Sequence, residues 1–333
     1  RHLQTSMLLV SCAFNILLFM LPIYGRRLGG SALSIGGLFS LFSAVTLLAR
    51  PLIGRGIDRY GRKKFLVSAF FVYAGSLLLF SRSADLGMLY AGRLLQGVGS
   101  SLMWIPAYST AMDLSDENQR GRSAGRIDGA SARGSLYGAV AGYAVLSFLP
   151  LMSGWRILFS GYAVLALAAG WIACRHLPET AAGGAAGPEE GLSLRRPWRG
   201  MNRDFTKLLI VVFIGAVSSS MALPMLLIYL QDRFTKDIGI LAAAYIPAAF
   251  VCSFLPSRLG RISDRIGRIG PMVIGSAASG VVSLAFPYAP GVPALAVLWV
   301  VDSVGSVMAS PAEKALVADL SGNEVRGSAY GVY

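Results

Sequence analysis

Apolar residues follow one another in long runs along this chain, and short polar loops separate the runs. A helix of about 20 apolar residues crosses the hydrocarbon core of a bilayer and satisfies its own backbone hydrogen bonds. The runs predict ten membrane-spanning helices, and the residues from Gly327 onward begin an eleventh. The ten runs are 5–24, 32–53, 65–81, 86–111, 127–149, 155–174, 207–230, 238–257, 270–288 and 292–317.

Lys and Arg gather in alternate loops, namely those after the second, fourth, sixth and eighth runs. Cytoplasmic loops of membrane proteins are rich in these residues, so the pattern predicts that the N-terminus and the basic loops are cytoplasmic. We therefore expect a multi-pass protein of an inner or plasma membrane. Its basic loops would meet the anionic inner leaflet of the bilayer.

Composition agrees with a membrane protein, because 54% of the 333 residues are hydrophobic and only 14% are charged. A net charge of +13 would suggest nucleic acid as the partner of a soluble protein. Here the charge lies between apolar runs, so we expect lipid and no nucleic acid. The three cysteines show no C-x-x-C spacing and no His/Asp/Glu cluster occurs, so no metal or cofactor is expected.

A block of sequence occurs twice at a constant offset. The sequence of Gly54–Arg62 is similar to that of Gly260–Arg268, and the two stretches lie 206 residues apart (260 − 54). Asp113-Leu-Ser with Arg120-Gly121 returns as Asp319-Leu-Ser with Arg326-Gly327, and 326 − 120 is again 206. Two matches at one offset indicate a duplicated membrane unit. Secondary transporters build their midplane binding sites from such paired halves.

The duplication predicts an all-α protein of two pseudo-symmetric six-helix bundles. Residues 1–180 would form the N-terminal bundle, 181–206 a cytoplasmic linker, and 207–333 an incomplete C-terminal bundle. The linker is rich in Gly and Ala and then basic, so it is either solvated or lies on the membrane surface. The sixth span ends near Cys174, so its copy, the twelfth span, would end near position 380 (174 + 206). We therefore expect a fragment of a twelve-helix protein.

The G-x-x-x-D-R-x-G-R-K pattern between the second and third runs, with a weaker copy between the eighth and ninth, resembles the signature loop of the major facilitator superfamily. The resemblance covers essentially the whole chain. It implies two bundles that rock about a cavity lined by spans 1, 4, 7 and 10, with a charged latch between them at the cytoplasmic face. The latch residues would be Gly54, Asp58, Arg59, Gly61, Arg62, Lys63, Gly260, Asp264, Arg265, Gly267 and Arg268.

General chemistry supports part of this latch. Asp58 can pair with an Arg or cap a helix N-terminus, and Gly54 and Gly61 would permit the tight reversal between helices. The alternative is a basic anchor on the cytoplasmic side with local capping. For Lys63 and Lys64, the latch and the basic anchor explain the residues equally well.

The fourth run contains R-x-x-Q-G-x-G, which is similar to a family motif associated with proton-coupled members. An Arg inside hydrocarbon costs on the order of 3 kcal/mol, so it should face a cavity or a partner. Helical spacing places four residues on one face: Arg93, Gln96, Ser100 and Trp104. The alternative is that Arg93 reaches the outer surface through its long side chain.

Glycines on the fifth run resemble the antiporter motif of the family. They are Gly125, Gly134, Gly138 and Gly142. Ala139 stands where the family has Pro, and Tyr143 where it has Gly, which leaves the direction of transport open. The glycines allow close helix approach, which we expect at the seam between the halves. Generic helix packing explains the same residues.

Asp302 lies near the middle of the tenth run, at the repeat position of Gln96 (302 − 206). Desolvation favours the protonated form of an isolated carboxylate. Asp302 can therefore exchange a proton for substrate, or pair with Arg93 across the cleft. The alternative is a hydrogen bond to a neighbouring helix and no role in transport.

Helical spacing supplies further candidates for a solute cavity. They are Asn15, Ser218, Met221, Met225, Tyr229, Trp299, Ser303 and Ser306. If these residues line a cavity, they favour an apolar or amphiphilic organic solute over a sugar. Core packing is the alternative for the Met and aromatic residues.

The leading hypothesis is a monomeric secondary transporter that exports a small organic solute as protons enter. A proton symporter or a uniporter that takes up a metabolite is the alternative within the same fold. An intramembrane enzyme would need paired Asp or a His-rich site at depth, and neither occurs. A receptor would give Arg93 and Asp302 no role. ATP-driven transport is not supported, because the sequence has no G-x-x-x-x-G-K-[ST] phosphate-binding loop. The solute, the coupling ion and the direction stay open.

Overall fold

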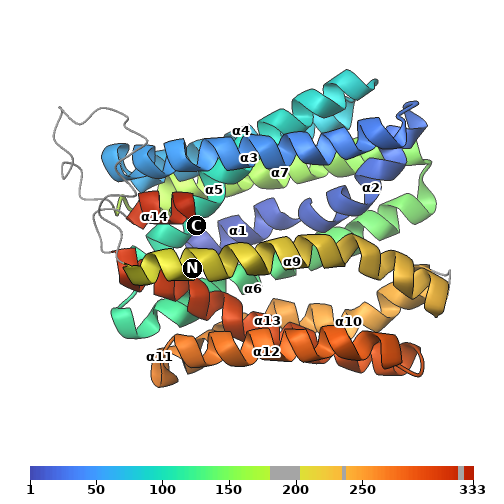
Figure 1. The fold of residues 1–333 in the computed structure, drawn as a ribbon. Coiled ribbons are helices and arrows are strands. Elements are labelled where there is room, and N and C mark those ends of the chain that lie inside the picture. The colour runs from blue at the N-terminus through green and yellow to red at the C-terminus, as the bar shows by residue number, and fades with distance from the viewer. Residues whose placement is uncertain (181–202, 235–237, 322–325) are drawn as a thin grey trace. The chain divides into compact units, whose positions relative to one another are not determined.

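The computed structural model describes residues 1–180, 203–234, 238–321 and 326–333, without the side chains of 19, 218–232 and 238–243. Every regular element within these residues is a helix, as the apolar runs predict (Figure 1). The elements are α1 (His2–Ser11), α2 (Phe14–Arg27), α3 (Ala32–Tyr60), α4 (Arg62–Arg82), α5 (Leu86–Asp113), η1 (Glu117–Gln119), α6 (Arg120–Phe148), α7 (Leu151–His176), α9 (Arg203–Arg233), α10 (Ile238–Phe254), α11 (Pro256–Ile266), α12 (Ile269–Ala285), η2 (Phe286–Tyr288), α13 (Val292–Ser321) and α14 (Arg326–Val332).

Two compact units make up the described chain. Within the described residues, the first comprises 1–115, 130–180 and 326–332, and the second comprises 116–129, 203–234, 238–321 and 333. The start of α6 thus belongs to the second unit, and α14 belongs to the first. Arg120 and Arg326 open these two helices, and they are related by the repeat offset of 206 (326 − 120). The division into bundles 1–180 and 207–333 stays a prediction.

The first unit is a set of helices that lie side by side (Figure 1). Helix α4 packs between α5 and α7, α3 packs on α5, α1 packs on α7, and α14 lies against α3 and α5. Buried aromatic rings tie α2 to α7, since Tyr24 and Trp155 stack with centroids 3.9 Å apart. Their polar atoms donate to the backbone carbonyls of Ser83 and Phe80, so burial leaves neither group without a hydrogen bond.

In the second unit, helix α13 contacts α10, α11 and α12. A cluster of Val282, Phe286 and Leu295 forms a buried core between α12, η2 and α13, and Leu298 and Trp299 pack at its edge. This packing fixes the orientation of α13. It thereby determines which helices lie next to Asp302.

Five described helices are long and apolar enough to cross a membrane, and there are six if the bent pair His2–Leu18 and Met20–Arg27 is counted as one span. The five are α3, α4, α7, α12 with η2, and α13. Helix α6 carries Asp128 and Arg133 within its expected span, and α10 has only 17 residues. The expected number of ten spans therefore stays a prediction.

Three helix boundaries differ from the apolar runs. The first run, 5–24, forms two helices rather than one. The run 238–257 stops at Phe254, and α11 begins at Pro256, because proline lacks a backbone N–H and suits the first turn of a helix. Helix α3 continues to Tyr60 and so includes most of the expected loop.

Candidate functional site

A glycine with positive φ makes the reversal between two helices in each repeat. Gly61 (φ 95°) ends α3 and precedes α4, and Gly267 (φ 92°) ends α11. Residues other than glycine rarely adopt this backbone conformation. The expectation for Gly61 is confirmed, and Gly267 repeats it.

Gly54 and Gly260 have a different role from the one expected, because both lie inside helices. A Cβ on Gly54 would collide with the carbonyl of Gly327, and a Cβ on Gly260 would collide with the carbonyl of Gly121. Gly54 therefore permits close contact between helices and takes no part in the reversal.

Asp58 holds the first turn of α14. Its carboxylate accepts hydrogen bonds from the backbone N–H of Gly327 (2.8 Å) and of Ser328 (2.7 Å) and from the Ser328 hydroxyl (2.8 Å). The first N–H groups of a helix have no partner within the helix and carry a partial positive charge. Asp58 therefore caps a helix 270 positions further along the chain.

Asp264 does the same for the first turn of α6 in the second unit. It accepts hydrogen bonds from the backbone N–H of Gly121 (2.8 Å) and of Arg122 (2.9 Å). Gly121 and Arg122 are the repeat positions of Gly327 and Ser328. The two caps are therefore copies of one another at the repeat offset.

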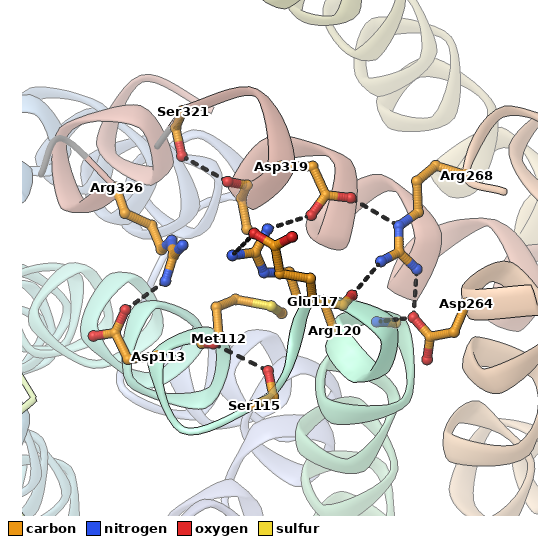
Figure 2. A network of polar contacts seen from close by, with 12 residues as sticks. Met112, Asp113, Ser115, Glu117, Arg120, Asp264, Arg268, Asp319, Ser321 and Arg326 are labelled. Atoms are coloured by element: carbon orange, nitrogen blue, oxygen red, sulfur yellow. Dashed lines mark hydrogen bonds and ion pairs between the residues drawn. The ribbon is translucent and has the colours of Figure 1, made fainter. Parts of the chain in front are cut away.

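Asp113 joins two buried guanidinium groups in the first unit. It pairs with Arg62 and, at 2.5 Å, with Arg326, as Figure 2 shows for Arg326. The exposed fractions of the three side chains are 12% for Asp113, 4% for Arg62 and 1% for Arg326. Arg62 also donates to the carbonyl of Ser109 (2.9 Å). Buried charges in this arrangement depend strongly on one another.

Asp319 occupies the corresponding place in the second unit (Figure 2). It pairs with Arg120 at 2.5 Å and with Arg268 at 2.9 Å, and Arg268 also pairs with Asp264. Burial lowers the pKa of the Arg268 guanidinium, but the hydrogen bonds to Asp264 and Asp319 outweigh it and the pKa is raised. Arg268 is thus held in its charged form.

The structure brings some of the expected latch residues into these networks and leaves others outside. Arg59 and Arg265 are exposed, and the Arg59 guanidinium lies 5.3 Å from the ring centroid of Tyr60. Lys63 contributes its backbone N–H, which donates to Glu179 at 3.2 Å. Asp58, Arg62, Asp264 and Arg268 take part through their side chains.

Four network residues stand out in the sequence only as repeat matches, and the sequence predicts no role for them. They are Asp113, Arg120, Asp319 and Arg326. Their charges and their common repeat offset were the features of the sequence that could have pointed to a role in these networks. Glu179, which accepts a hydrogen bond from the Arg62 N–H at 2.7 Å, gave no such signal.

Arg93 is buried in the first unit, with 5% of its surface exposed. It donates to Gln96 (2.7 Å), which donates to the Tyr73 hydroxyl (3.0 Å). The guanidinium lies over the rings of Phe39 and Phe42, at 4.6 and 5.1 Å from their centroids. Arg93 and Gln96 share a face as expected, and the burial excludes an Arg93 that reaches the surface.

Asp302 lies on α13 and interacts electrostatically with Tyr245 and Cys252 of α10. The ring of Tyr245 contacts Trp299, with centroids 5.5 Å apart. Ser303 is buried and hydrogen-bonds Cys252. Among the residues whose side chains are described, none forms an ion pair with Asp302.

The remaining cavity candidates fall into three groups. Ser100 is buried, and Trp104 packs between the rings of Phe14 and Tyr108. Asn15 and Ser306 are exposed. The other candidates lie outside the described side chains, and they are Ser218, Met221, Met225 and Tyr229.

The glycines of α6 pack within the first unit. A Cβ on Gly134 or Gly138 would collide with the backbone of Leu8 or Cys12, and one on Gly142 with the side chain of Ile16. These three glycines therefore allow α6 to approach α1 and α2, and their expected place at the seam between the halves is wrong. Gly125 instead lies against the carbonyl of Pro256 in the second unit.

One ion pair in the second unit has no counterpart in the repeat. Lys314 on α13 donates to both carboxylate oxygens of Asp128 on α6, at 2.7 and 2.8 Å, and to the Ser310 hydroxyl at 2.9 Å. The repeat position of Lys314 is Tyr108 (314 − 206). Neither residue belongs to a repeated motif, so the sequence predicts no role for this pair.

Known proteins resemble the chain over most of its length. A family model described as Major Facilitator Superfamily matches residues 5–333. The tetracycline resistance protein, class G, of Vibrio anguillarum is 28% identical over 74% of this chain and 62% of its own length. The multidrug resistance protein MdtL of Salmonella paratyphi B is 25% identical over 78% of this chain and 65% of its own. The chain thus spans less than two thirds of these relatives.

Solved structures agree in fold. The human organic anion transporter MFSD10 matches with a TM-score of 0.80 and 20% identity, over 99% of this chain and 88% of its own. The transporter FucP in the outward conformation matches with a TM-score of 0.82 and 15% identity, over 99% and 87% of the two chains. At these identities the likeness concerns the fold alone.

Proposed function

The chain belongs to the Major Facilitator Superfamily, and on that premise we propose that it exports a small apolar or amphiphilic organic solute in exchange for protons. Alternating access is the mechanism that a duplicated membrane unit serves. The resistance proteins among its relatives favour efflux of an organic compound. The observation that carries the proposal is the pair of copied charge networks, because each one joins residues of both sequence repeats.

These networks act as the conformational latch. Asp58 of the first repeat caps α14 of the second, and Asp264 of the second repeat caps α6 of the first. Tilting the repeats apart would break both caps and both Arg–Asp clusters together. Buried charges without partners are costly, so the networks favour one conformation until solute or proton binding offsets that cost. The basic loops support a position of this latch at the cytoplasmic side.

Proton coupling is assigned to Arg93, Gln96 and Asp302. Asp302 gains or loses the proton, since a carboxylate at mid-span has no paired cation among the described side chains. Arg93 carries a fixed positive charge that Gln96 and the rings of Phe39 and Phe42 hold in place. The solute cavity, the bilayer with its anionic inner leaflet, a cytoplasmic N-terminus and a monomeric state belong to the same proposal.

A proton symporter or a uniporter is the second candidate. Ala139 stands where the antiporter motif of the family has Pro, and this departure favours considering the opposite direction. An enzymatic role is not proposed.

Transport by the native protein in inverted membrane vesicles tests the proposal. With an acidic lumen, fluorescent organic solutes should accumulate inside, and Asp302→Asn should abolish the accumulation while the protein remains in the membrane. Equilibration without a gradient would support the uniporter. Full activity of Asp302→Asn would remove Asp302 from the coupling mechanism, and the absence of gradient-driven movement for every solute would overturn proton-coupled export.

A further inference from the structure

A row of aromatic rings runs through the first unit from the Arg93 site to α14. Each ring contacts the next, with centroids 5.7 to 6.0 Å apart, and aromatic pairs attract one another at such separations. We call these residues the aromatic row. In order of contact they are Tyr73, Phe14, Trp104, Tyr108 and Tyr330.

One end of the row lies at the buried Arg93 site. Tyr73 is 1% exposed, and its hydroxyl accepts a hydrogen bond from Gln96 at 3.0 Å. Gln96 in turn accepts a hydrogen bond from Arg93 at 2.7 Å. Because buried polar groups are costly without a partner, a change in these hydrogen bonds acts on the position of the Tyr73 ring.

The other end of the row lies on α14, beside the first charge network. Tyr330 is 3% exposed and follows Arg326 by four residues, which is about one helical turn. Arg326 pairs with Asp113, and Asp58 accepts the N–H of Ser328 between them. The packing of Tyr330 therefore positions the same turn that the cap and the ion pair hold.

The second unit joins the matching helices by charge instead of rings. The repeat positions of Trp104 and Tyr108 are Ser310 and Lys314 (310 − 104 and 314 − 108), and both donate hydrogen bonds to Asp128 of α6. The junction with the capped helix is thus aromatic in the first unit and ionic in the second. The aromatic row is not repeated, because its five positions correspond to Ser279, Ser220, Ser310, Lys314 and Ala124.

From these contacts we propose that the aromatic row couples the Arg93 site to the latch of the first unit. The packing of Tyr330 on α14, and with it the Asp58 cap, follows the state of the hydrogen bond between Gln96 and Tyr73. The inference rests on the latch proposed above and names what regulates it. Trp104 and Tyr108 are positioning residues for the cap, because they act on it only through α14.

Close packing explains how the row transmits a displacement. Aromatic rings are rigid, and a packed interior leaves a displaced ring no free volume, so the next ring must move or lose its contact. Coupling between sites also needs an element with two states that both sites bias. The first turn of α14 is such an element, because its N–H groups are either held by Asp58 or released to water.

Hydrogen–deuterium exchange of the purified native protein in lipid nanodiscs tests the proposal, because amides exchange when their hydrogen bonds open. Gln96→Leu removes the hydrogen bond to Tyr73 at the far end of the row. The amides of Gly327 and Ser328 should then exchange about two- to thirtyfold faster, which is the range for coupling through packed residues. Tyr73→Phe removes only the accepting hydroxyl and should change the same amides in the same direction.

The second unit supplies an internal control. The amides of Gly121 and Arg122, which Asp264 caps, should keep their exchange rates in both variants, because the row does not reach them. Ser101→Ala is the matched control variant. It removes another buried hydrogen bond of α5, to the carbonyl of Gly97, and should leave the exchange of α14 unchanged.

Interrupting the row separates transmission from general loosening of the first unit. In a Trp104→Leu background, Gln96→Leu should have no further effect on α14, whereas Trp104→Phe keeps a ring and should preserve the effect. Equal acceleration of the amides in α7 and α14 would overturn the inference, and so would unchanged exchange in α14 or an effect that persists in Trp104→Leu. Selective acceleration in a protein that moves no solute in vesicles would support the row and reject the transport function.

Discussion

The two repeats are nearly identical in their charge networks and different at mid-span. Asp58 and Asp264 cap equivalent helices, and Asp113 and Asp319 each join two equivalent Arg residues. At mid-span, by contrast, Arg93 corresponds to Trp299 and Gln96 to Asp302. The proposed latch would open and close at both copies, which agrees with the preservation of both networks. A solute site benefits from asymmetry, because one solute cannot satisfy two identical halves unless it is itself symmetric.

The largest expected effect concerns the buried centre of the first network. Asp113→Ala leaves Arg62 and Arg326 buried without their carboxylate, and we expect a loss of about 3–5 kcal/mol of folding free energy. Asp319→Ala should cost less, because Asp319 is 29% exposed and Asp113 is 12% exposed. Denaturant unfolding in detergent measures both, with the exposed Asp116→Asn as the control. Equal losses would show that burial does not distinguish the two networks.

The second prediction concerns the close contacts of the two glycines inside helices. Gly54→Ala and Gly260→Ala must each separate a helix from an opposing carbonyl, and we expect about 1–3 kcal/mol of destabilisation from overpacking. Gly36→Ala is the matched control, because a Cβ there meets no atom within 4 Å and Ala favours a helix over Gly. Thermal unfolding of the three variants measures the difference. Equal stability of Gly54→Ala and Gly36→Ala would contradict the proposed contact.

The Asp128–Lys314 pair tests the asymmetric part of the comparison. A double-mutant cycle with Asp128→Asn and Lys314→Met should give a coupling free energy of about 0.5–3 kcal/mol. The same cycle with Asp204→Asn and Lys207→Met, an exposed pair, should give about 0–1 kcal/mol. Coupling at Asp128–Lys314 no larger than at the exposed pair would mean that this ion pair stabilises nothing beyond a surface contact.

The sequence predicted more of the two charge networks than of the mid-span sites, and the reason is physical. A turn with positive φ and a helix cap have local signatures, so Gly61 and Asp58 could be assigned from the motif alone. The partners of Asp58 lie in α14, and only the repeat offset links them to the motif. Gly54 was misplaced because a loop pattern continued as helix α3. The aromatic contacts of Arg93 depend on the packing of α3 on α5, which no spacing rule provides.

The helix caps give the smallest effect and the sharpest comparison between repeats. Asp58→Ala removes three hydrogen bonds to α14, and Asp264→Ala removes two to α6 and also the pairing with Arg268. Loss of a cap costs about 0.5–2 kcal/mol, and the additional loss at Arg268 should make Asp264→Ala the more destabilising change. Unfolding of both single variants and of the double variant measures this order.

Because the two caps lie in different units, additive losses are expected if each acts locally. A double variant that loses less than the sum would show that opening one cap already opens the other, which is the behaviour of a single latch with two copies of its parts.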